Sequence, residues 1–129
     1  MSYIIPLADL EAFYDEPGEY GWILEATRHG FERISLIITD TLPGGGPPLH
    51  RHTCEEAVVV PTGARMRYLI DGTEHDVAGP AVLRIPAGAT HAFVNAGPER
   101  VSLTCIFPDR GFWEGYIELG PNPLLSHEH

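Results

Sequence analysis

Polar and apolar residues alternate along several short segments of the chain. In the segment 64–70, Met66 and Tyr68 alternate with Arg65 and Arg67. Side chains of a strand point to its two faces in turn, so this period of two predicts a strand with one apolar face. We expect Met66 and Tyr68 to point into a core and the two arginines to point into solvent.

Further strands are expected where short apolar or β-branched runs are bounded by Gly, Pro or Asp-Gly. Asp71-Gly72 and His29-Gly30 each predict a hairpin turn, and the Gly- and Pro-rich run 42–48 predicts irregular backbone. An acidic, turn-rich segment is expected at 8–19, after a short edge strand at 3–7 that tolerates its proline. The remaining expected strands are 22–27, 31–41, 49–53, 57–60, 64–70, 73–77, 82–85, 92–95 and 101–107. Many short strands at this spacing predict an all-β sandwich or barrel.

The period of two ends after Pro108. Phe112, Trp113 and Tyr116 begin a set of apolar residues at roughly helical spacing, which predicts a short C-terminal helix or a flap across the barrel. We expect Trp113 and Tyr116 to cover the barrel surface rather than to stack on a substrate.

Length, charge and cysteine content narrow the class of protein. The 129 residues suffice for one compact domain, which we expect to span residues 1–129. A formal net charge of −10 argues against binding to nucleic acid or to an anionic membrane. Cys54 and Cys105 do not make a disulfide framework, and residues 1–10 lack the parts of a signal peptide. A soluble, cytoplasmic protein with a small-molecule partner is therefore expected.

Four side chains form a candidate metal site. His50 and His52 are two residues apart, so on a strand both rings point to the same face. Glu56 follows closely, and His91 begins a segment that reads as a neighbouring strand. Three imidazoles and one carboxylate suit a divalent transition metal and leave coordination positions open for a ligand. Cys54 shares the parity of the histidines, but it is expected to be a small core residue rather than a thiolate ligand.

The spacing of these residues resembles two motifs of the cupin superfamily, in particular those of its small, quercetin-dioxygenase-like members. The first is Gly44-x5-His50-x-His52-x3-Glu56-x6-Gly63, and the second is Pro86-x-Gly88-x2-His91-x3-Asn95. Together they span residues 44–95. One position departs from the family pattern: Gly79 lies seven residues before Pro86, where the family usually has six.

The resemblance implies a double-stranded β-helix, the jelly-roll barrel of the cupins, and one metal ion per chain. It places His50, His52, Glu56 and His91 at the metal-ligand positions, where family members hold iron, manganese, nickel, zinc or copper. Glu55 is an alternative to Glu56, but the motif spacing and the strand parity favour Glu56. Small cupins are often homodimers that pair or exchange N-terminal strands, a role that the segment 3–7 would have here.

The cavity and the reaction are less constrained by the sequence. Met66, Tyr68 and Phe93 are candidates for the cavity wall, although each also fits an ordinary core. The resemblance favours a metal-dependent, dioxygenase-like enzyme. One alternative is a metal-dependent isomerase or lyase acting on a sugar or keto acid, which needs a general acid or base such as Glu55 or Tyr68. The other is a non-catalytic module that binds a small ligand or a metal.

Overall fold

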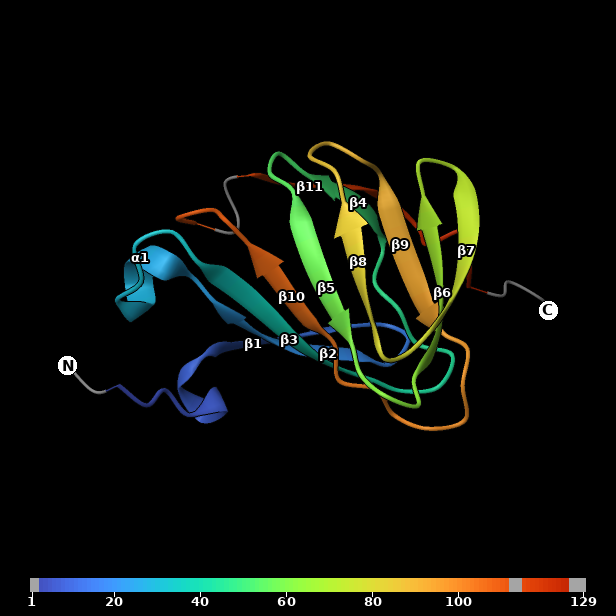
Figure 1. Ribbon diagram of the computed structural model, residues 1–129, viewed down its shortest axis with the longest axis horizontal. Coiled ribbons are helices and arrows are strands. Elements are labelled where there is room, and N and C mark those ends of the chain that lie inside the picture. Colours follow the sequence, from blue (N-terminus) through green and yellow to red (C-terminus); the bar gives the residue numbers. More distant parts are fainter. Residues whose placement is uncertain (1–2, 112–114, 126–129) are drawn as a thin grey trace.

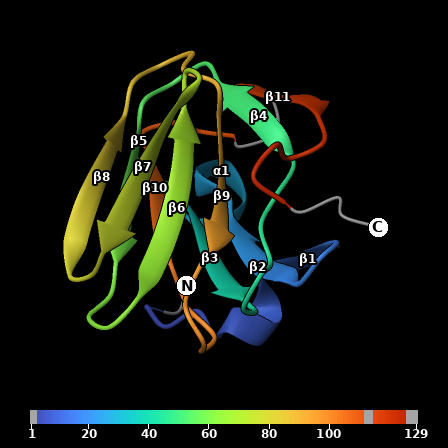
Figure 2. The ribbon, with the colours of Figure 1, turned by 90° about the vertical axis from the view of Figure 1, so that its right-hand side faces the viewer.

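The computed structural model describes residues 3–111 and 115–125 and shows two antiparallel sheets that face each other (Figures 1 and 2). One sheet has six strands in the order β1-β2-β3-β10-β5-β8, and the other has five in the order β11-β4-β9-β6-β7. This arrangement confirms the all-β, two-sheet barrel that the sequence predicts.

The bounds of the strands agree with most of the expected segments to within a few residues. The six-stranded sheet contains β1 (Glu11–Asp15), β2 (Glu19–Leu24), β3 (Ser35–Thr41), β10 (Thr104–Phe107), β5 (Glu56–Val60) and β8 (Ala81–Ile85). The five-stranded sheet contains β11 (Tyr116–Gly120), β4 (Leu49–His52), β9 (His91–Asn95), β6 (Arg65–Ile70) and β7 (Thr73–Ala78). Two short helical turns, η1 (Leu7–Asp9) and α1 (Ala26–His29), lie near the N-terminus. In the described ranges, no helix is long and apolar enough to cross a membrane.

The N-terminal predictions need correction. Residues 3–7 form no strand, and Tyr3 and Ile4 are exposed. Pro6 lacks a backbone donor, and its carbonyl instead accepts the N–H of Asp9 to begin the turn η1. The acidic segment that follows contains the strand β1, which the sequence does not predict because most of this edge strand is exposed and lacks a clear apolar face.

The His29-Gly30 pair does not form a hairpin turn. It ends the short helix α1, where Gly30 takes the left-handed conformation at φ 84° and donates its N–H to the carbonyl of Ala26. Glycine is the usual residue at this position after a helix because it has no side chain to clash. The next strand, β3, therefore starts at Ser35 and not at Phe31.

The C-terminal prediction of a helix or flap is wrong where it can be compared with the structure. Residues 116–120 form the strand β11, which pairs with β4 and sets Tyr116 opposite His52. Phe112 and Trp113, which are also part of that prediction, lie outside the described residues. The apolar residues here have the spacing of a helix. The backbone is nevertheless extended, because it pairs with a strand more than 60 residues earlier in the chain.

The core lies between the inner faces of the two sheets. Met66 and Tyr68 point inward and are 2% and 1% exposed, while Arg65 and Arg67 are exposed, as predicted. The other large buried apolar side chains include Ile23, Val58, Val60, Ile85, Leu103 and Phe107.

Asn95, the last residue of β9, binds both the loop that follows it and the end of β3. Its amide nitrogen donates to the carbonyls of Thr41, at 3.0 Å, and Glu99, at 2.7 Å, and its side-chain oxygen accepts the N–H of Gly97 at 3.0 Å. The side chain is 1% exposed. These three bonds fix the loop after β9 against the end of β3.

Replacing Asn95 with Ala is expected to lower the free energy of unfolding by about 2–4 kcal/mol, because it removes three hydrogen bonds and leaves the Thr41 carbonyl buried without this donor. Urea unfolding followed by circular dichroism measures the change. Glu99→Ala is the control, because the Glu99 side chain is exposed and only its carbonyl takes part. Equal stability of the two variants would contradict the assignment.

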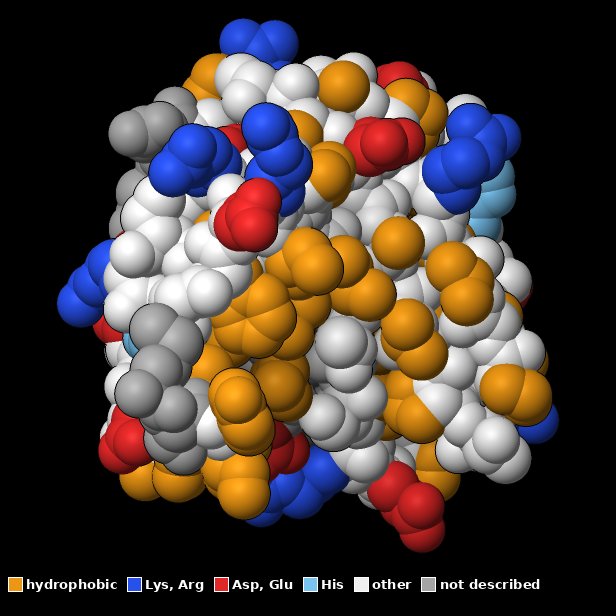
Figure 3. Space-filling model, turned by 60° about the vertical axis from the view of Figure 1, so that its left-hand side comes forward, with side chains coloured by type: hydrophobic (Ala, Val, Ile, Leu, Met, Phe, Trp, Pro, Cys, Tyr) orange, Lys and Arg blue, Asp and Glu red, His pale blue; other side chains and the backbone are white. Residues whose placement is uncertain are grey.

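The outer face of the six-stranded sheet is largely apolar. The strand register sets Trp22 beside Ile38, Ile38 beside Thr104, Thr104 beside Val59, and Val59 beside Val82. Val59 is 41% exposed and Val82 is 69% exposed. Figure 3 shows hydrophobic side chains gathered across one face of the molecule.

Candidate metal centre

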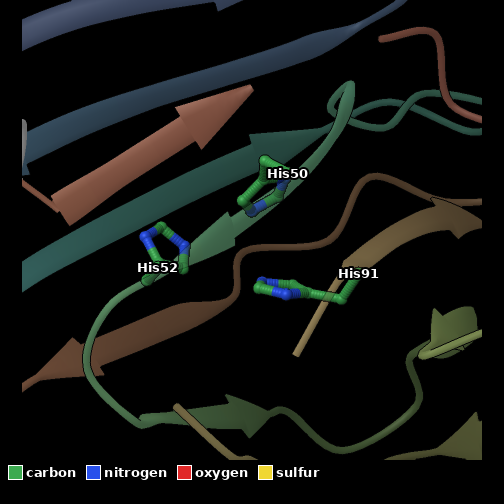
Figure 4. Close-up of side chains that lie close together, drawn as sticks. All are labelled: His50, His52 and His91. Carbon is green, nitrogen blue, oxygen red and sulfur yellow. The ribbon is translucent and has the colours of Figure 1, made fainter. Parts of the chain in front are cut away.

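Three histidines from two paired strands point to a common region (Figure 4). His50 and His52 lie on β4, where Arg51 between them is exposed and both rings are buried. His91 is the first residue of β9 and lies directly opposite His50 in the register. The structure therefore brings together the three imidazoles that the sequence predicts to be neighbours.

The three rings are close enough to share one ion. One nitrogen of each lies within 4.8 Å of the others, and the ring centroids are 5.0 Å apart for His50 and His52 and 4.3 Å apart for His50 and His91. Nitrogens bound to one ion at about 2.1 Å lie roughly 3–4 Å apart. A small inward movement of the rings would therefore close them around a metal.

Backbone carbonyls orient two of the rings. The Nδ1 atom of His50 lies 2.7 Å from the Pro48 carbonyl, and that of His91 lies 2.9 Å from the Ala89 carbonyl. A carbonyl only accepts hydrogen bonds, so the proton is assigned to Nδ1 in both rings. Their Nε2 lone pairs are then available to a metal, in the arrangement typical of protein-bound ions.

The surroundings keep two of the rings neutral. Burial lowers the pKa of His50 to about 3, assisted by the nearby His91 and opposed by the hydrogen bond to Pro48. Burial also lowers the pKa of His52 to about 3, with further contributions from His50 and His91. Neutral imidazole is the form that binds a metal, so these rings need no deprotonation near neutral pH.

Glu56 lies beside the histidines and is 6% exposed, whereas Glu55 points to solvent. The Oε1 atom of Glu56 lies 3.1 Å from Nε2 of His91 and 3.6 Å from Nε2 of His52. The contact with His52 is not an ion pair, because the pKa of that ring is far below neutral pH. With its proton on Nδ1, His91 turns a lone pair toward the carboxylate oxygen. A cation between these groups would stabilise both, so the donor set fits a divalent metal.

A pocket with mostly apolar walls adjoins these residues. Its volume is about 60 Å³, and its lining includes the three histidines and Glu56 together with Tyr68, Phe93, Phe107 and Tyr116. Tyr68 and Phe93 thus lie where a cavity wall is expected. Met66 packs in the hydrophobic core and is not among the residues that line this pocket.

Tyr116 and Glu19 are among the pocket residues that the sequence does not predict. Tyr116 is not a mere surface cover: it lines the pocket, and its ring centroid lies 5.3 Å from that of His50 and 5.6 Å from that of His52. Glu19 lines the same pocket, is 2% exposed and accepts a hydrogen bond from the Thr41 hydroxyl at 2.5 Å. Glu19 lies an even number of residues before the buried Ile23, so on one strand both side chains point to the same face. The sequence-based prediction misses this because its strand begins only at residue 22.

Comparison with known proteins gives a match to a family model. Residues 38–107 match the model described as a cupin domain, a range that contains all three histidines and Glu56. This is more than half of the chain, so the match defines the family.

Relatives with known names share part of this sequence. Auxin-binding protein 1 of Arabidopsis thaliana is 26% identical over 102 residues, which cover 72% of this chain and 52% of that protein. Auxin-binding protein T85 of Nicotiana tabacum is 30% identical over 78 residues, which cover 54% of this chain and 42% of that protein. The aligned part is thus about half the length of these relatives.

Solved structures support the fold. A formate complex of Lactobacillus farciminis oxalate decarboxylase superposes with a TM-score of 0.74 at 24% identity, covering 87% of this chain and 34% of that chain. Bacillus subtilis oxalate decarboxylase at pH 4.6 gives a TM-score of 0.77 at 20% identity, covering 89% of this chain and 31% of that chain. At such identities the similarity shows the fold alone, and this chain corresponds to about a third of each neighbour.

Proposed function

The chain belongs to the cupin family, and from this we propose that it is a metal-dependent enzyme with dioxygenase-like chemistry on a small molecule. One observation carries the proposal: three imidazoles and a carboxylate converge at the wall of a small pocket with mostly apolar walls. A bound divalent metal supplies Lewis acidity and open coordination positions. The chain's own residues hold the ion, orient its ligands through Pro48 and Ala89, and line the pocket with aromatic rings that displace water.

Metal content and oxygen uptake test this function. The purified, untagged protein is analysed for bound metal by mass spectrometry, reconstituted with Fe(II), and screened for O₂ consumption with flavonols, catechols and thiols. About one iron per chain with substrate-dependent O₂ uptake supports the proposal. Turnover without O₂ and with a redox-silent metal would favour an isomerase or lyase. No metal after reconstitution would leave a non-catalytic binding module.

We further propose that Glu56 is the fourth ligand, and a pair of neighbouring variants tests this. Glu56→Gln is expected to weaken metal binding roughly 10- to 100-fold, because it replaces an anionic oxygen donor by a neutral amide. Glu55→Gln is the matched control, because Glu55 is the neighbouring residue and its side chain is exposed. Competition with a chromogenic chelator measures both affinities. Equal losses in the two variants would remove Glu56 from the site.

A second candidate function is a metal-dependent isomerase or lyase. Such chemistry needs a general acid or base near the metal. The sequence offers only Glu55 and Tyr68 as candidates for this role. The structure adds Glu19 to the same pocket. Burial, partly offset by the Thr41 hydrogen bond, raises the pKa of Glu19 to about 8, which suits proton transfer near neutral pH.

We propose that the protein is a homodimer that covers the apolar outer face of the six-stranded sheet. A second copy is the proposed occupant because one mostly apolar row there runs through Ile38, Thr104, Val59 and Val82, and two-fold pairing would bury the same row of both chains. We expect exchange between chains, if it occurs, to involve the N-terminal segment, where Tyr3 and Ile4 are exposed.

Val59→Asp is expected to shift the protein from dimer to monomer, because a charge in the middle of a buried apolar row has no partner there. Size-exclusion chromatography with light scattering reports the mass. Thr73→Asp, in an exposed position of β7 on the other sheet, is the control. A wild-type protein that is monomeric at all concentrations tested would refute the dimer.

A further inference from the structure

The pocket has polar side chains in addition to the candidate metal ligands, and Glu19 and Tyr68 are two of them. Glu19 opens β2 in the six-stranded sheet, and Tyr68 lies on β6 in the five-stranded sheet. Both line the pocket that contains the histidines. Their side chains are 2% and 1% exposed, so they belong to the interior of the barrel. Neither residue belongs to the two cupin motifs, which cover residues 44–63 and 86–95.

The Tyr68 hydroxyl lacks a hydrogen-bond partner among the described residues, although it is fully buried. Its ring packs against Phe93 at a centroid distance of 5.1 Å, which fixes the direction of the side chain. Buried hydroxyls nearly always have a partner. A ligand oxygen in the pocket that Tyr68 lines would supply one.

The Glu19 carboxyl is almost equally isolated. Thr41 is its one hydrogen-bond partner among the described side chains, and no arginine or histidine of these residues forms an ion pair with it. Burial is the main cause that raises its pKa, and the charges of Asp15 and Asp40 add to it. At neutral pH the group is therefore largely a neutral acid, which can both donate and accept a hydrogen bond.

A purely structural role explains these two groups poorly. A carboxyl and a phenol on opposite sheets do not bond to each other, and apolar residues of similar size would fill the space without the cost of burying polar atoms. Burial is the main cause that raises the pKa of Tyr68, and Cys105, Glu56 and Glu19 add to it. Their common feature is the pocket between them.

We propose that Glu19 and Tyr68 form a hydrogen-bonding subsite for an uncharged hydroxyl or carbonyl oxygen of the ligand, while a second oxygen of the same ligand lies at the metal centre. The ligand class is a small molecule with two oxygen functions joined by a short carbon chain. A space of about 60 Å³ holds only a few heavy atoms, so the part of the ligand that carries the two oxygens is short. The part concerning the metal rests on the proposed function, whereas the subsite itself needs no metal.

Matched pairs of ketones test the subsite. Hydroxyacetone is compared with 2-butanone, and 4-hydroxy-2-butanone with 2-pentanone, because in each pair a methyl group replaces the hydroxyl. Dissociation constants are measured by NMR titration of the ¹⁵N-labelled protein, once in its zinc form and once after removal of metal by a chelator. At least one hydroxy ketone is expected to bind roughly five-fold or more tightly than its methyl partner in both forms of the protein. A roughly five-fold difference in affinity corresponds to about one hydrogen bond.

Three variants test whether the preference for the hydroxy ketone arises at the subsite. Tyr68→Phe and Glu19→Leu are expected to abolish most of the preference for the hydroxy ketone while leaving the affinity for the alkyl ketone within about two-fold. Tyr20→Phe is the control, because Tyr20 follows Glu19 in β2 but is exposed. The ¹⁵N spectra show whether each variant is folded, and if Glu19→Leu is not, Glu19→Gln takes its place with a reduced preference expected.

Each outcome decides the proposal. A preference that occurs only in the zinc form means chelation by the metal, and one that survives Tyr68→Phe in the metal-free form means recognition by other groups; either result overturns the subsite. No preference in either form of the wild-type protein also overturns it. Metal content is measured in every sample. A protein that binds no metal but keeps a Tyr68-dependent preference would refute the proposed function and leave the subsite intact.

Discussion

Replacing His50 and His52 together with Ala is expected to abolish stoichiometric metal binding and to leave the barrel folded. The double variant loses two of the three imidazoles, and the remaining His91 and Glu56 make a weak site. Structural metal sites in proteins commonly bind with about 10–16 kcal/mol, most of which requires the complete ligand set. The metal content is therefore expected to fall from about one ion per chain to less than about a tenth. Mass spectrometry of the reconstituted and dialysed protein measures it.

Folding of the double variant is expected because the two histidines lie near the barrel wall and not in the centre of the core. Val58, Ile85 and Leu103 are more deeply buried and do not change. A cooperative thermal transition and an unchanged far-ultraviolet circular dichroism spectrum would confirm the fold. The control is a double variant of His29 and His75, of which His29 is only half-buried and His75 is exposed. If the His50/His52 variant retains its full metal content, the assigned site is wrong.

The histidines of the candidate metal centre are predictable from the sequence because their geometry depends on local rules. Two residues at i and i+2 on a strand share a face whatever the rest of the fold does, so His50 and His52 follow from spacing alone. His91 follows from the second motif, and the structure sets it opposite His50. The same period of two correctly assigns Met66 and Tyr68 to the interior.

Features that depend on distant strands are not predictable in this way. Tyr116 reaches the pocket because β11 pairs with β4, and nothing near Tyr116 in the sequence specifies that partner. Glu19 is buried because its strand faces a sheet made from later segments, whereas composition alone assigns an acidic residue to the surface. The helix α1 is missed for a different reason: glycine serves equally in a hairpin turn and after a helix, and the sequence does not separate the two.

Residues outside the motifs change the chemical interpretation of the site. The motifs supply a candidate metal centre of a kind that serves many reactions, so they constrain the reaction weakly. Glu19 and Tyr68 add hydrogen-bonding groups in the same pocket, and Tyr116 adds an aromatic ring against His50 and His52. Under the proposed function, selectivity for a small molecule would depend on these residues outside the motifs, so the motifs alone do not specify the ligand.

Stability is expected to depend on pH through Glu19. The pKa of its carboxyl rises from an ordinary value of 4.5 to about 8 on folding, mainly through burial. The folded state thus holds this proton more tightly than the unfolded state. Its contribution to stability is fully present below about pH 4.5 and is lost as the pH rises toward 8, by an amount on the order of 5 kcal/mol for this difference in pKa.

The variant Glu19→Gln isolates this contribution because glutamine has a similar shape and does not titrate. Urea unfolding between pH 5 and pH 9 is expected to show a free energy of unfolding that falls with pH more steeply in the wild-type protein than in the variant. Asp15 and Asp40, the nearby acids, and Tyr68, the nearby phenol, are present in both proteins, so their effects largely cancel in the difference. Glu32→Gln, at an exposed position, is expected to follow the wild-type curve. Parallel curves for wild type and Glu19→Gln would mean that the Glu19 carboxyl titrates as if it were in water, and the buried neutral acid would have to be abandoned.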